Sequence, residues 1–220
     1  MNPILIMLLL FYFFSPVYSA TDIQAVIEQL QKTYDSIHST KANFEQIYVS
    51  PKFGEEKKMK GEVFFVKPGK MRWNYKNPQG RVLVSDGKTV TLYDPEDQQA
   101  MVSQQPEEGS LPGSLSFLVG TGKLKDSFKI TLVEEKEKQL ILRCQPINPE
   151  PNVSEIYLTV EKGEQMMVVA SRVIDLLGGE NRITFSKIDN RTPIKPETFT
   201  FTIPKDAILV SFPEHKKKIK

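Results

Sequence analysis

The chain has 220 residues, and its 29 Lys and Arg side chains nearly balance its 27 Asp and Glu side chains, which leaves a formal net charge of +2. Such a small charge argues against a general nucleic-acid binder. The single cysteine, Cys144, cannot form an internal disulfide, so an ordinary apolar core must hold the fold together.

The first 20 residues have the pattern of a secretory signal peptide. An unbroken apolar stretch, 4–14, is followed by Ser15-Pro16 and then by small residues, as expected for an apolar core of roughly 7–15 residues before a cleavage site. We expect cleavage after Ser19 or Ala20, with an uncleaved anchor as the alternative. The rest of the chain, 21–220, suits one domain, because all-β domains commonly reach roughly 200–250 residues.

An amphipathic helix is predicted directly after the signal segment. Thr21 can cap this helix, and Gln24, three residues later, can complete a capping box. Apolar residues then recur at spacings of three and four, which predicts one apolar stripe that needs a surface to cover. The stripe consists of Ile23, Val26, Ile27, Leu30, Tyr34 and Ile37.

From Ala42 onward apolar and polar residues alternate with a period of two, which predicts β-strands. The clearest strand is 70–76, in which Met71, Trp73 and Tyr75 alternate with charged or polar residues, so one face is apolar and the other wet. We expect about a dozen short strands in a meander of hairpins. Further predicted strands are 44–49, 60–67, 98–103, 127–134, 139–144, 181–188 and 198–203.

Turn residues between these strands support the meander. Asp86-Gly87 and Lys162-Gly163 each separate two apolar runs, which is typical of a β-hairpin. One interruption lies between Gln104 and Asp126, where Pro112 stands near the start and Gly120 just past the end of an apolar segment. That asymmetry predicts a short apolar helix.

A dozen antiparallel strands with one apolar face predict a mainly β (α+β) protein built on a single large curved sheet, whose apolar side must be covered. The charged neighbours on each strand set which side chains point to this inner face. They do not separate a filled core from a ligand cavity, because both require the same burial. The residues assigned to the inner face are Phe44, Val63, Phe65, Met71, Trp73, Tyr75, Val82, Val84, Val90, Leu92, Ile183 and Phe185.

No catalytic constellation is visible in the sequence. His38 ends the first predicted helix and His215 lies in a basic tail, so neither is placed as a base for nucleophilic catalysis. Cys144 alternates with apolar residues on a strand, which favours a buried inert thiol over a nucleophile. Metal ligands at useful spacings are missing as well. We expect neither an enzyme nor a cofactor.

Several segments resemble the outer-membrane lipoprotein carrier family, known as LolA. The most specific is the hairpin 83–95, followed by Gln99-Ala100. Around it stand 42–46, 61–73 with its Lys67-Pro68 turn, and the closing 199–204, in the order and roughly the spacing of the family. The resemblance covers nearly the whole chain after the signal segment.

The resemblance implies an unclosed half-barrel of antiparallel strands with a helical lid over an apolar cavity, located in the periplasm. The cargo would be acylated lipoproteins, received from an inner-membrane ABC lipoprotein exporter and delivered to an outer-membrane lipoprotein acceptor, with the carrier acting as a monomer. The lid would be formed by the first helix and by the short helix after Gln104. Its residues would be Ile23, Val26, Ile27, Leu30, Leu115, Phe117 and Leu118.

One position departs from the family. The best-studied members have an arginine just before the proline of this turn, where it hydrogen-bonds the lid backbone, and this chain has Lys67. A lysine lacks the planar guanidinium fork, so Lys67 is either a different latch or an exposed strand-end lysine. Arg72 and Arg81 are alternative latches, although alternation places both of them outward.

Two other functions remain open on the same scaffold. The protein could carry another lipid or amphiphile, or serve as an envelope-stress sensor or regulatory binding domain. Cargo discriminates among the three functions, since they predict a triacylated polypeptide, a free lipid, and a stable protein partner with an empty cavity. Trp73, predicted to face inward, should report occupancy of the cavity in the first two cases.

Overall fold

The computed structural model describes residues 21–104, 123–148 and 153–211. The predicted signal segment lies outside them. Within the described residues the protein is mostly β, with two α-helices and one 3-10 helix. In chain order the elements are α1 (Ile23–Ser36), β1 (Ser39–Val49), β2 (Glu56–Val66), β3 (Lys70–Asn77), β4 (Gln79–Asp86), β5 (Thr89–Asp94), β6 (Gln99–Gln104), α3 (Leu124–Ser127), β7 (Phe128–Glu135), β8 (Gln139–Pro146), β9 (Glu155–Glu161), β10 (Met167–Ile174), β11 (Glu180–Asp189), η1 (Pro196–Phe199) and β12 (Ile208–Ser211).

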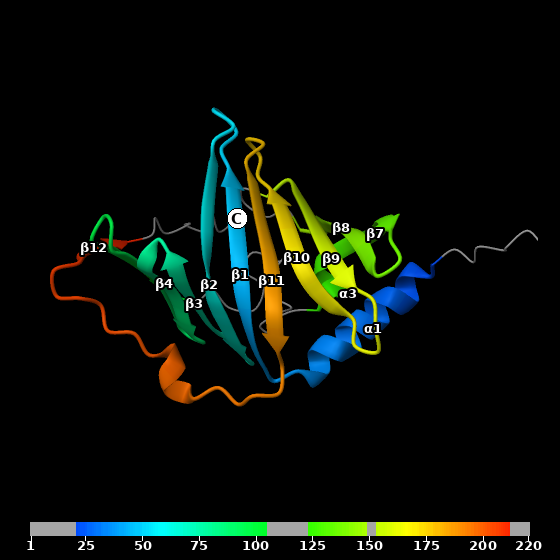
Figure 1. The fold of residues 1–220 in the computed structure, drawn as a ribbon, viewed down its shortest axis with the longest axis horizontal. Coiled ribbons are helices and arrows are strands. Elements are labelled where there is room, and N and C mark those ends of the chain that lie inside the picture. The colour runs from blue at the N-terminus through cyan, green and yellow to red at the C-terminus, as the bar shows by residue number, and fades with distance from the viewer. Residues whose placement is uncertain (1–20, 105–122, 149–152, 212–220) are drawn as a thin grey trace, which may run out of the picture.

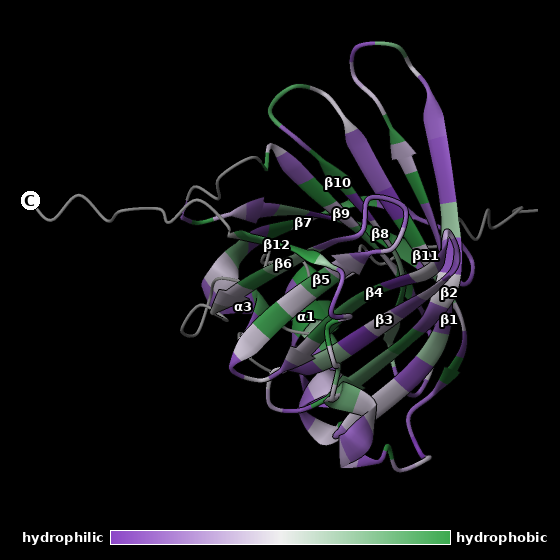
Figure 2. Cartoon of the chain, turned by 90° about the vertical axis from the view of Figure 1, so that its left-hand side faces the viewer, coloured by the Kyte–Doolittle hydropathy of each residue, from purple (hydrophilic) through white to green (hydrophobic). Residues whose placement is uncertain are grey.

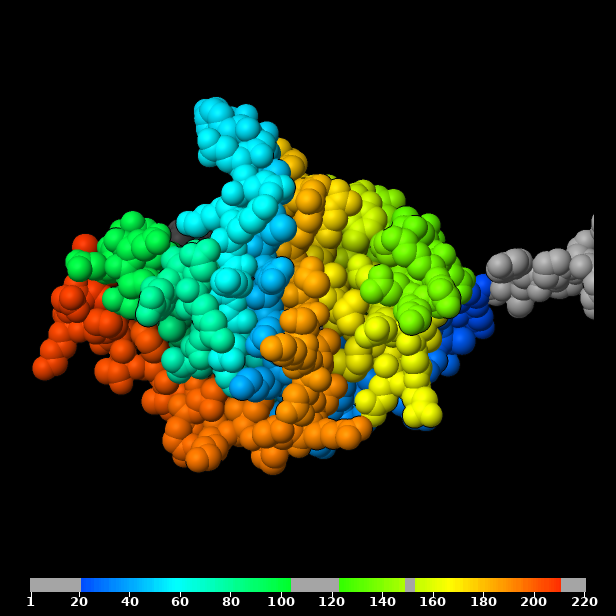
Figure 3. All heavy atoms as spheres, viewed as in Figure 1, coloured from blue at the N-terminus to red at the C-terminus, as the bar shows by residue number. Residues whose placement is uncertain are grey.

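All twelve described strands form one sheet, in the order β12-β6-β5-β4-β3-β2-β1-β11-β10-β9-β8-β7 (Figure 1). Neighbouring strands run antiparallel except for β12, which runs parallel to β6. The order is linear, with β12 and β7 at its two edges, so the sheet is not closed into a barrel. The hairpin between β1 and β2 extends beyond the neighbouring strands (Figure 3). The predicted large, unclosed antiparallel sheet is confirmed.

The hairpin predicted at Asp86-Gly87 is present and has a clear local cause. The carboxylate of Asp86 accepts hydrogen bonds from the backbone N–H groups of Lys88 and Thr89, both at 2.8 Å. Gly87 has a φ of +97°, a left-handed conformation that glycine adopts without strain. These bonds hold the pKa of the Asp86 carboxyl below its usual value. The turn therefore joins β4 to β5 as the sequence predicts.

Helix α1 begins one residue later than the sequence suggested. Asp22, rather than Thr21, is the N-cap, and its carboxylate accepts from the backbone N–H groups of Gln24 (2.9 Å) and Ala25 (3.4 Å). Thr21 instead donates its hydroxyl hydrogen to the carboxylate of Glu135. Asp and Thr side chains both satisfy free helix N–H groups, so the capping pattern predicted a helix start here but not which of the two residues is the cap.

A first apolar cluster holds α1 against the inner face of β7 to β10. The predicted stripe supplies Val26, Ile27, Leu30 and Tyr34, all buried, while Ile23 is half-buried against the same cluster. On the sheet side every second residue of the strands points at the helix, an alternation that is visible along the strands in Figure 2. The sheet and α3 contribute Leu124, Phe128, Ile130, Leu140, Leu142, Cys144, Ile156, Leu158, Val160 and Val168.

A second apolar cluster covers the same face of the sheet over β1, β2, β3 and β11. The pairing of Phe44 with Phe185 and of Ser171 with Ile183 carries the inner face continuously from the first cluster to this one. The described residues of this second cluster all come from strands, so neither α1 nor α3 contributes to it. Its buried members are Ala42, Phe44, Val63, Phe65, Met71, Trp73, Ile183 and Phe185.

The side chains of strand β4 lie on the opposite faces of the sheet to those predicted. Trp73 pairs with Leu83, which puts Leu83 on the inner face, whereas Val82 and Val84 pair with Asn74 and Arg72 and face outward. The assignment of Val82 and Val84 to the inner face was therefore wrong. The pairing is irregular between Asn74 and Lys76, where two β4 residues stand opposite one β3 residue. This extra residue exchanges the faces on which the following β4 side chains lie.

The strand predicted at 198–203 is also absent. The described residues there form η1 and then an extended segment that runs along the outer face of β3 and β4. One guanidinium nitrogen of Arg72 donates to the backbone carbonyls of Thr198 and Thr200, both at 3.0 Å, and Phe199 between them is buried. The last strand, β12, follows only at 208–211.

The short helix predicted between Gln104 and Asp126 lies mostly outside the described residues, as do Leu115, Phe117 and Leu118. The described structure resumes with the four-residue helix α3, whose Leu124 is fully buried under α1. Neither of the two described α-helices is long and apolar enough to cross a membrane.

Candidate functional site

The inner face over β1 to β5 and β11 brings together ten of the twelve residues predicted to line it. Seven of them, Phe44, Val63, Phe65, Met71, Trp73, Ile183 and Phe185, are buried in the second cluster. Tyr75 and Val90 pack against this cluster, and Leu92 joins the same face through its pairing with Leu83. Sequence reasoning missed Leu83, which stands between two apolar residues, and Ala42, although it lies two residues before Phe44 and shares its face.

Aromatic rings form the centre of this face. Phe44 lies edge-on to Trp73 and to Tyr75, with ring centroids 4.8 and 5.1 Å apart. Phe65 and Phe185 flank Trp73 at 5.9 and 6.1 Å. Such tilted and edge-on contacts are favourable between aromatic quadrupoles and give the face a defined shape. The result is an apolar surface built mostly from large rings, which spans β1, β2, β3 and β11.

Polar groups border the rings toward the ends of β1 and β4. The Tyr75 hydroxyl donates to Oε1 of Gln46 (3.1 Å), and the Gln46 amide donates to Oδ1 of Asn181 (2.9 Å). Arg81, expected to point outward, instead lies over the Tyr75 ring at 5.4 Å, with its Nε 3.6 Å from the Asp94 carboxylate. Burial raises the pKa of Tyr75, and the nearby Arg81 charge lowers it.

Helix α1, which the resemblance assigns to the lid, lies across the β7–β10 half of the inner face (Figure 1). Ile23, Val26, Ile27 and Leu30 all face the sheet there. Directly after Leu30, Gln31 accepts a hydrogen bond through its side-chain oxygen from the backbone N–H of Leu124 (3.0 Å) and so joins α1 to α3. Four of the seven predicted lid residues are thus placed together.

Lys67 reaches the same helix from the opposite half of the sheet. Its ammonium donates a hydrogen bond to the backbone carbonyl of Tyr34, in the last turn of α1. Burial lowers the pKa of Lys67, and the negative charge of Asp35 opposes that effect. Arg72 makes no such contact, because it holds the carbonyls of Thr198 and Thr200 on the outer face.

Tyr34 is also fixed from the β10 side. Its hydroxyl oxygen accepts from the backbone N–H of Val168 at 3.1 Å, next to the irregularity in pairing between Val168 and Ala170. Burial raises the pKa of the Tyr34 hydroxyl far above its usual value, so it remains a neutral phenol. One residue of α1 therefore contacts both halves of the sheet, through its backbone on one side and its side chain on the other.

Two cavities adjoin Tyr34 and the end of α1. A small one of about 20 Å³ lies between the two apolar clusters and is lined by Tyr34, Thr40, Ala42, Phe65, Met167, Val168, Phe185 and Ile188. An open groove of about 710 Å³ lies beside it, lined by 185–191 and by residues at the ends of α1 and β10, and it shares Met167, Phe185 and Ile188. The small cavity holds little more than a water molecule, so a long apolar ligand requires the two clusters to separate.

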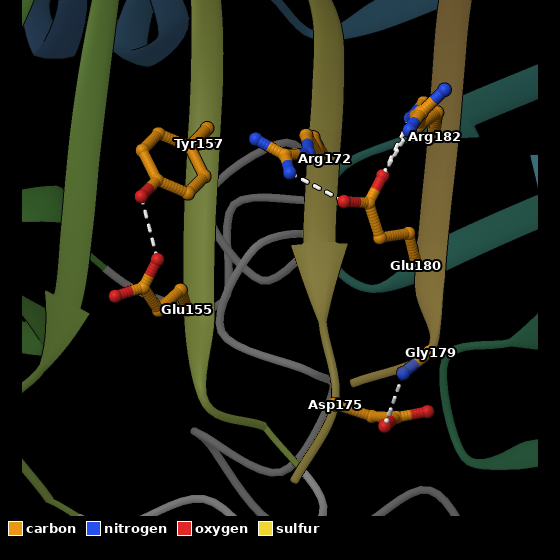
Figure 4. Close-up of polar contacts among 7 residues, drawn as sticks. All are labelled: Glu155, Tyr157, Arg172, Asp175, Gly179, Glu180 and Arg182. Carbon is orange, nitrogen blue, oxygen red and sulfur yellow. Dashed lines mark hydrogen bonds and ion pairs between the residues drawn. The ribbon is translucent and has the colours of Figure 1, made fainter. Parts of the chain in front are cut away.

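The outer face of the sheet has a different character, with ion pairs between neighbouring strands (Figure 4). Glu180 binds Arg172 and Arg182, which face each other across β10 and β11. The hydrogen bond from Arg172, and then that from Arg182, lowers the pKa of Glu180 to about 2. On β9 the hydroxyl of Tyr157 donates to Glu155 at 2.5 Å. These pairs are structural contacts on a solvated surface.

The described residues contain no group of three or more His, Cys, Asp or Glu side chains placed to hold a metal ion. Cys144 is buried within the first cluster, and burial raises the pKa of its thiol to about 12, so a reactive thiolate is not formed at neutral pH. What the site presents is an apolar surface with a helix across part of it.

An open sheet with an apolar inner face and a helix tied across it defines a half-barrel binding protein. The chain belongs to the LolA family, because the family model described as "Outer membrane lipoprotein carrier protein LolA" matches residues 35–202. Members of this family are periplasmic lipoprotein carriers.

Individual relatives agree with the family assignment. An outer-membrane lipoprotein carrier protein of Bordetella pertussis is 27% identical over 83% of this chain and 85% of its own length. Another from Dechloromonas aromatica is 28% identical over 84% of this chain and 86% of its own. An uncharacterized conserved protein from Thermus thermophilus shares the fold, with a TM-score of 0.53 at 14% identity over 86% of this chain and 99% of that one.

Proposed function

We propose that this protein carries lipoproteins across the periplasm by sheltering their acyl chains on the inner face of the sheet. The observation that carries the proposal is the second apolar cluster, a surface of large rings to which neither described α-helix contributes. Next to it lies α1, tied across the sheet by Lys67. The carrier names of the relatives support the same cargo.

The cargo needs such a shelter for a simple energetic reason. At about 0.8 kcal/mol per methylene, exposing three chains of about fifteen methylenes to water would cost on the order of 35 kcal/mol. A free lipoprotein therefore does not cross an aqueous compartment unaided. The carrier has to bind these chains less strongly than a membrane does, or it would never release them.

The contacts of α1 provide a means of limiting affinity. To enter between the clusters, acyl chains must displace apolar contacts of α1 and the Lys67 hydrogen bond to Tyr34. The free energy of those lost contacts is subtracted from the free energy of binding. Lys67 acts as the latch in this scheme, and an inner-membrane ABC exporter supplies the cargo while an outer-membrane acceptor removes it. Residues 1–20 would direct export and be removed.

A transfer assay tests this proposal. Membrane vesicles that hold a labelled lipoprotein and its ATP-driven exporter are incubated with the protein, and the supernatant is assayed for a soluble one-to-one complex. Leu92 and Thr91 are adjacent on β5 and point to opposite faces. Leu92→Glu should abolish ATP-dependent release, and Thr91→Glu should preserve it.

Other results would reject the proposal. No release by the unaltered protein, with an exporter that works with a known carrier, would exclude the lipoprotein function. If Leu92→Glu preserved release and Thr91→Glu abolished it, the binding site would lie on the outer face. Recovery of free lipid would instead indicate another amphiphile as cargo, and recovery of a stable protein partner with an empty cavity would indicate a regulatory binding domain.

A further inference from the structure

The indole of Trp73 is an enclosed polar group on the ring-lined part of the inner face. Its residue is 2% exposed and lies on β3 between Val63 and Leu83 of the neighbouring strands. Phe44, Phe65 and Phe185 surround the ring. Phenylalanine side chains contain no conventional hydrogen-bond acceptor, so none of these three rings can accept a conventional hydrogen bond from the indole N–H.

The indole nitrogen has no hydrogen-bond partner among the described residues. An indole N–H can only donate, and buried donors are nearly always paired in folded proteins. A phenylalanine would fill a similar volume without leaving a donor in an apolar shell. The unpaired N–H of Trp73 therefore requires an explanation that packing does not provide.

Other polar aromatic groups on this face are paired. The Tyr75 hydroxyl donates to Gln46 at 3.1 Å, and the Tyr34 hydroxyl accepts from the N–H of Val168 at 3.1 Å. The fold is thus able to satisfy buried aromatic polar groups on the same face as Trp73. Trp73 is therefore an unpaired aromatic donor on a face whose two tyrosine hydroxyls are paired.

We propose that Trp73 donates its indole N–H to an ester carbonyl of the acylated cargo. This assignment rests on the proposed function, since it identifies the atom that recognises the chains. An acyl chain brings an acceptor only at its carbonyl end, and that carbonyl loses its hydrogen bonds to water when it enters an apolar face. One bond then satisfies both the carbonyl and the indole, and fixes how deep that acyl chain lies.

The neighbouring geometry gives the chain a direction beyond the carbonyl. Phe65 and Phe185, which flank the indole, also line the small cavity beside Tyr34 and Ala42. Methylenes that follow the carbonyl can extend along these rings toward that cavity, which widens as α1 is displaced. Trp73 therefore supplies the donor, and the two rings that flank it supply the path for the chain.

A pair of soluble probes tests the assignment. Dioctanoyl phosphatidylglycerol contains two ester carbonyls, and its dioctyl ether analogue contains none, with the same headgroup and nearly the same apolar length. Affinities of the full chain for each are measured by titration calorimetry below the concentration at which the probes form micelles. We expect the ester probe to bind about fivefold more tightly, the ratio typical of one net hydrogen bond.

Two variants locate the effect. Trp73→Phe keeps a ring and removes the donor, so it should bind both probes with the affinity that the unaltered protein has for the ether. Lys76→Gln changes an exposed residue on the same strand, outside the second cluster, and should keep the fivefold preference. Retention of the preference in Trp73→Phe, or its loss in Lys76→Gln, would overturn the assignment.

A spectroscopic measurement on the unaltered protein does not depend on how the variants fold. With ¹³C at the ester carbonyls, the new hydrogen bond should place the carbonyl stretching frequency of the bound probe below that of the same probe dissolved in an alkane, and an alkane-like frequency in the bound probe contradicts the proposal. Equal binding of both probes by the unaltered protein overturns the role of Trp73 alone. Binding of neither probe overturns the acyl-binding function together with it.

Discussion

The ammonium of Lys67 donates a hydrogen bond to the backbone carbonyl of Tyr34, and this contact joins the turn after β2 to the last turn of α1. Carbonyls in the last turn of a helix have no partner further along the helix, and a cation there interacts favourably with the helix dipole. The N–H of Ile37 also donates to this carbonyl at 3.2 Å. The contact therefore acts on the end of the predicted lid nearest to the two cavities.

Removing this cation should loosen α1 locally. In Lys67→Met the charged hydrogen bond is lost, and the free energy that holds the end of the helix closed should fall by about 1.5 kcal/mol. Amides in 33–37 should then exchange with solvent roughly tenfold faster, as measured by hydrogen exchange. Lys60→Met, at an exposed lysine of β2, should leave these rates unchanged. Equal rates in Lys67→Met and the unaltered protein would contradict a latch at this position.

The close approach of β2 to β3 depends on Gly61. A Cβ placed there would lie 2.0 Å from the backbone oxygen of Asn74 and 2.8 Å from a ring carbon of Phe44. The backbone oxygen cannot rotate away, so Gly61→Ala should separate the strands and destabilise the fold by about 3 kcal/mol, at the upper end of typical overpacking. Denaturant unfolding measures this change.

Gly163 provides the matched control. A Cβ at this turn glycine would meet its nearest neighbour at 3.8 Å, an ordinary contact. Gly163→Ala should therefore change the free energy of unfolding by less than about 0.5 kcal/mol. Similar losses in both alanine variants would show that the contact of Gly61 with Asn74 does not govern the result.

Arg72 should control the segment around η1. Its guanidinium donates to two carbonyls there and lies 5.9 Å from the centroid of the Phe201 ring. Arg72→Ala removes these contacts and should cost about 2 kcal/mol, with faster proteolytic cleavage within 195–205. Arg191→Ala, at an exposed arginine before η1, should leave the cleavage rate unaltered. Cleavage that begins elsewhere in Arg72→Ala would reject this anchoring role.

The sequence predicted where the helices and strands lie better than it predicted which face of the sheet each side chain occupies. Period-two alternation located nearly every strand because one face of each is buried, and the stripe of α1 followed from spacings of three and four. Strand β4 has three consecutive apolar residues, so alternation alone could not assign Val82, Leu83 and Val84 to a face. The pairing irregularity opposite Tyr75 then decided their phase, and such an irregularity depends on the partner strand.

The C-terminal segment shows a second limit of local pattern. Residues 199–203 alternate as a strand does, yet no described strand pairs with them there. Their course is set by Arg72, more than 120 residues earlier in the chain. The sequence pattern indicated only that Arg72 faces outward, and did not predict that it binds this C-terminal segment. The contact of Lys67 with Tyr34 was equally invisible to local pattern, and was suggested only by the family resemblance.

The last prediction concerns acid stability and Glu180, which binds Arg172 and Arg182 on the outer face (Figure 4). Its pKa is about 2 in the fold against a usual value of 4.5. A carboxyl with a lowered pKa stabilises the fold fully above its usual value, and this contribution is lost as the pH falls from 4.5 toward 2.

Glu180→Gln should therefore be less stable than the unaltered protein at pH 6, by about 1 kcal/mol, because both arginines are partly exposed and solvent screens the pairs. The two free energies of unfolding should converge as the pH approaches 2, where the native carboxyl becomes protonated. Chemical denaturation at pH 6, 4 and 2.5 measures the difference. Glu164→Gln, at an exposed turn position, should show no such pH-dependent gap. A gap in Glu180→Gln that stays constant across this range would mean that its origin is packing and not the charge of Glu180.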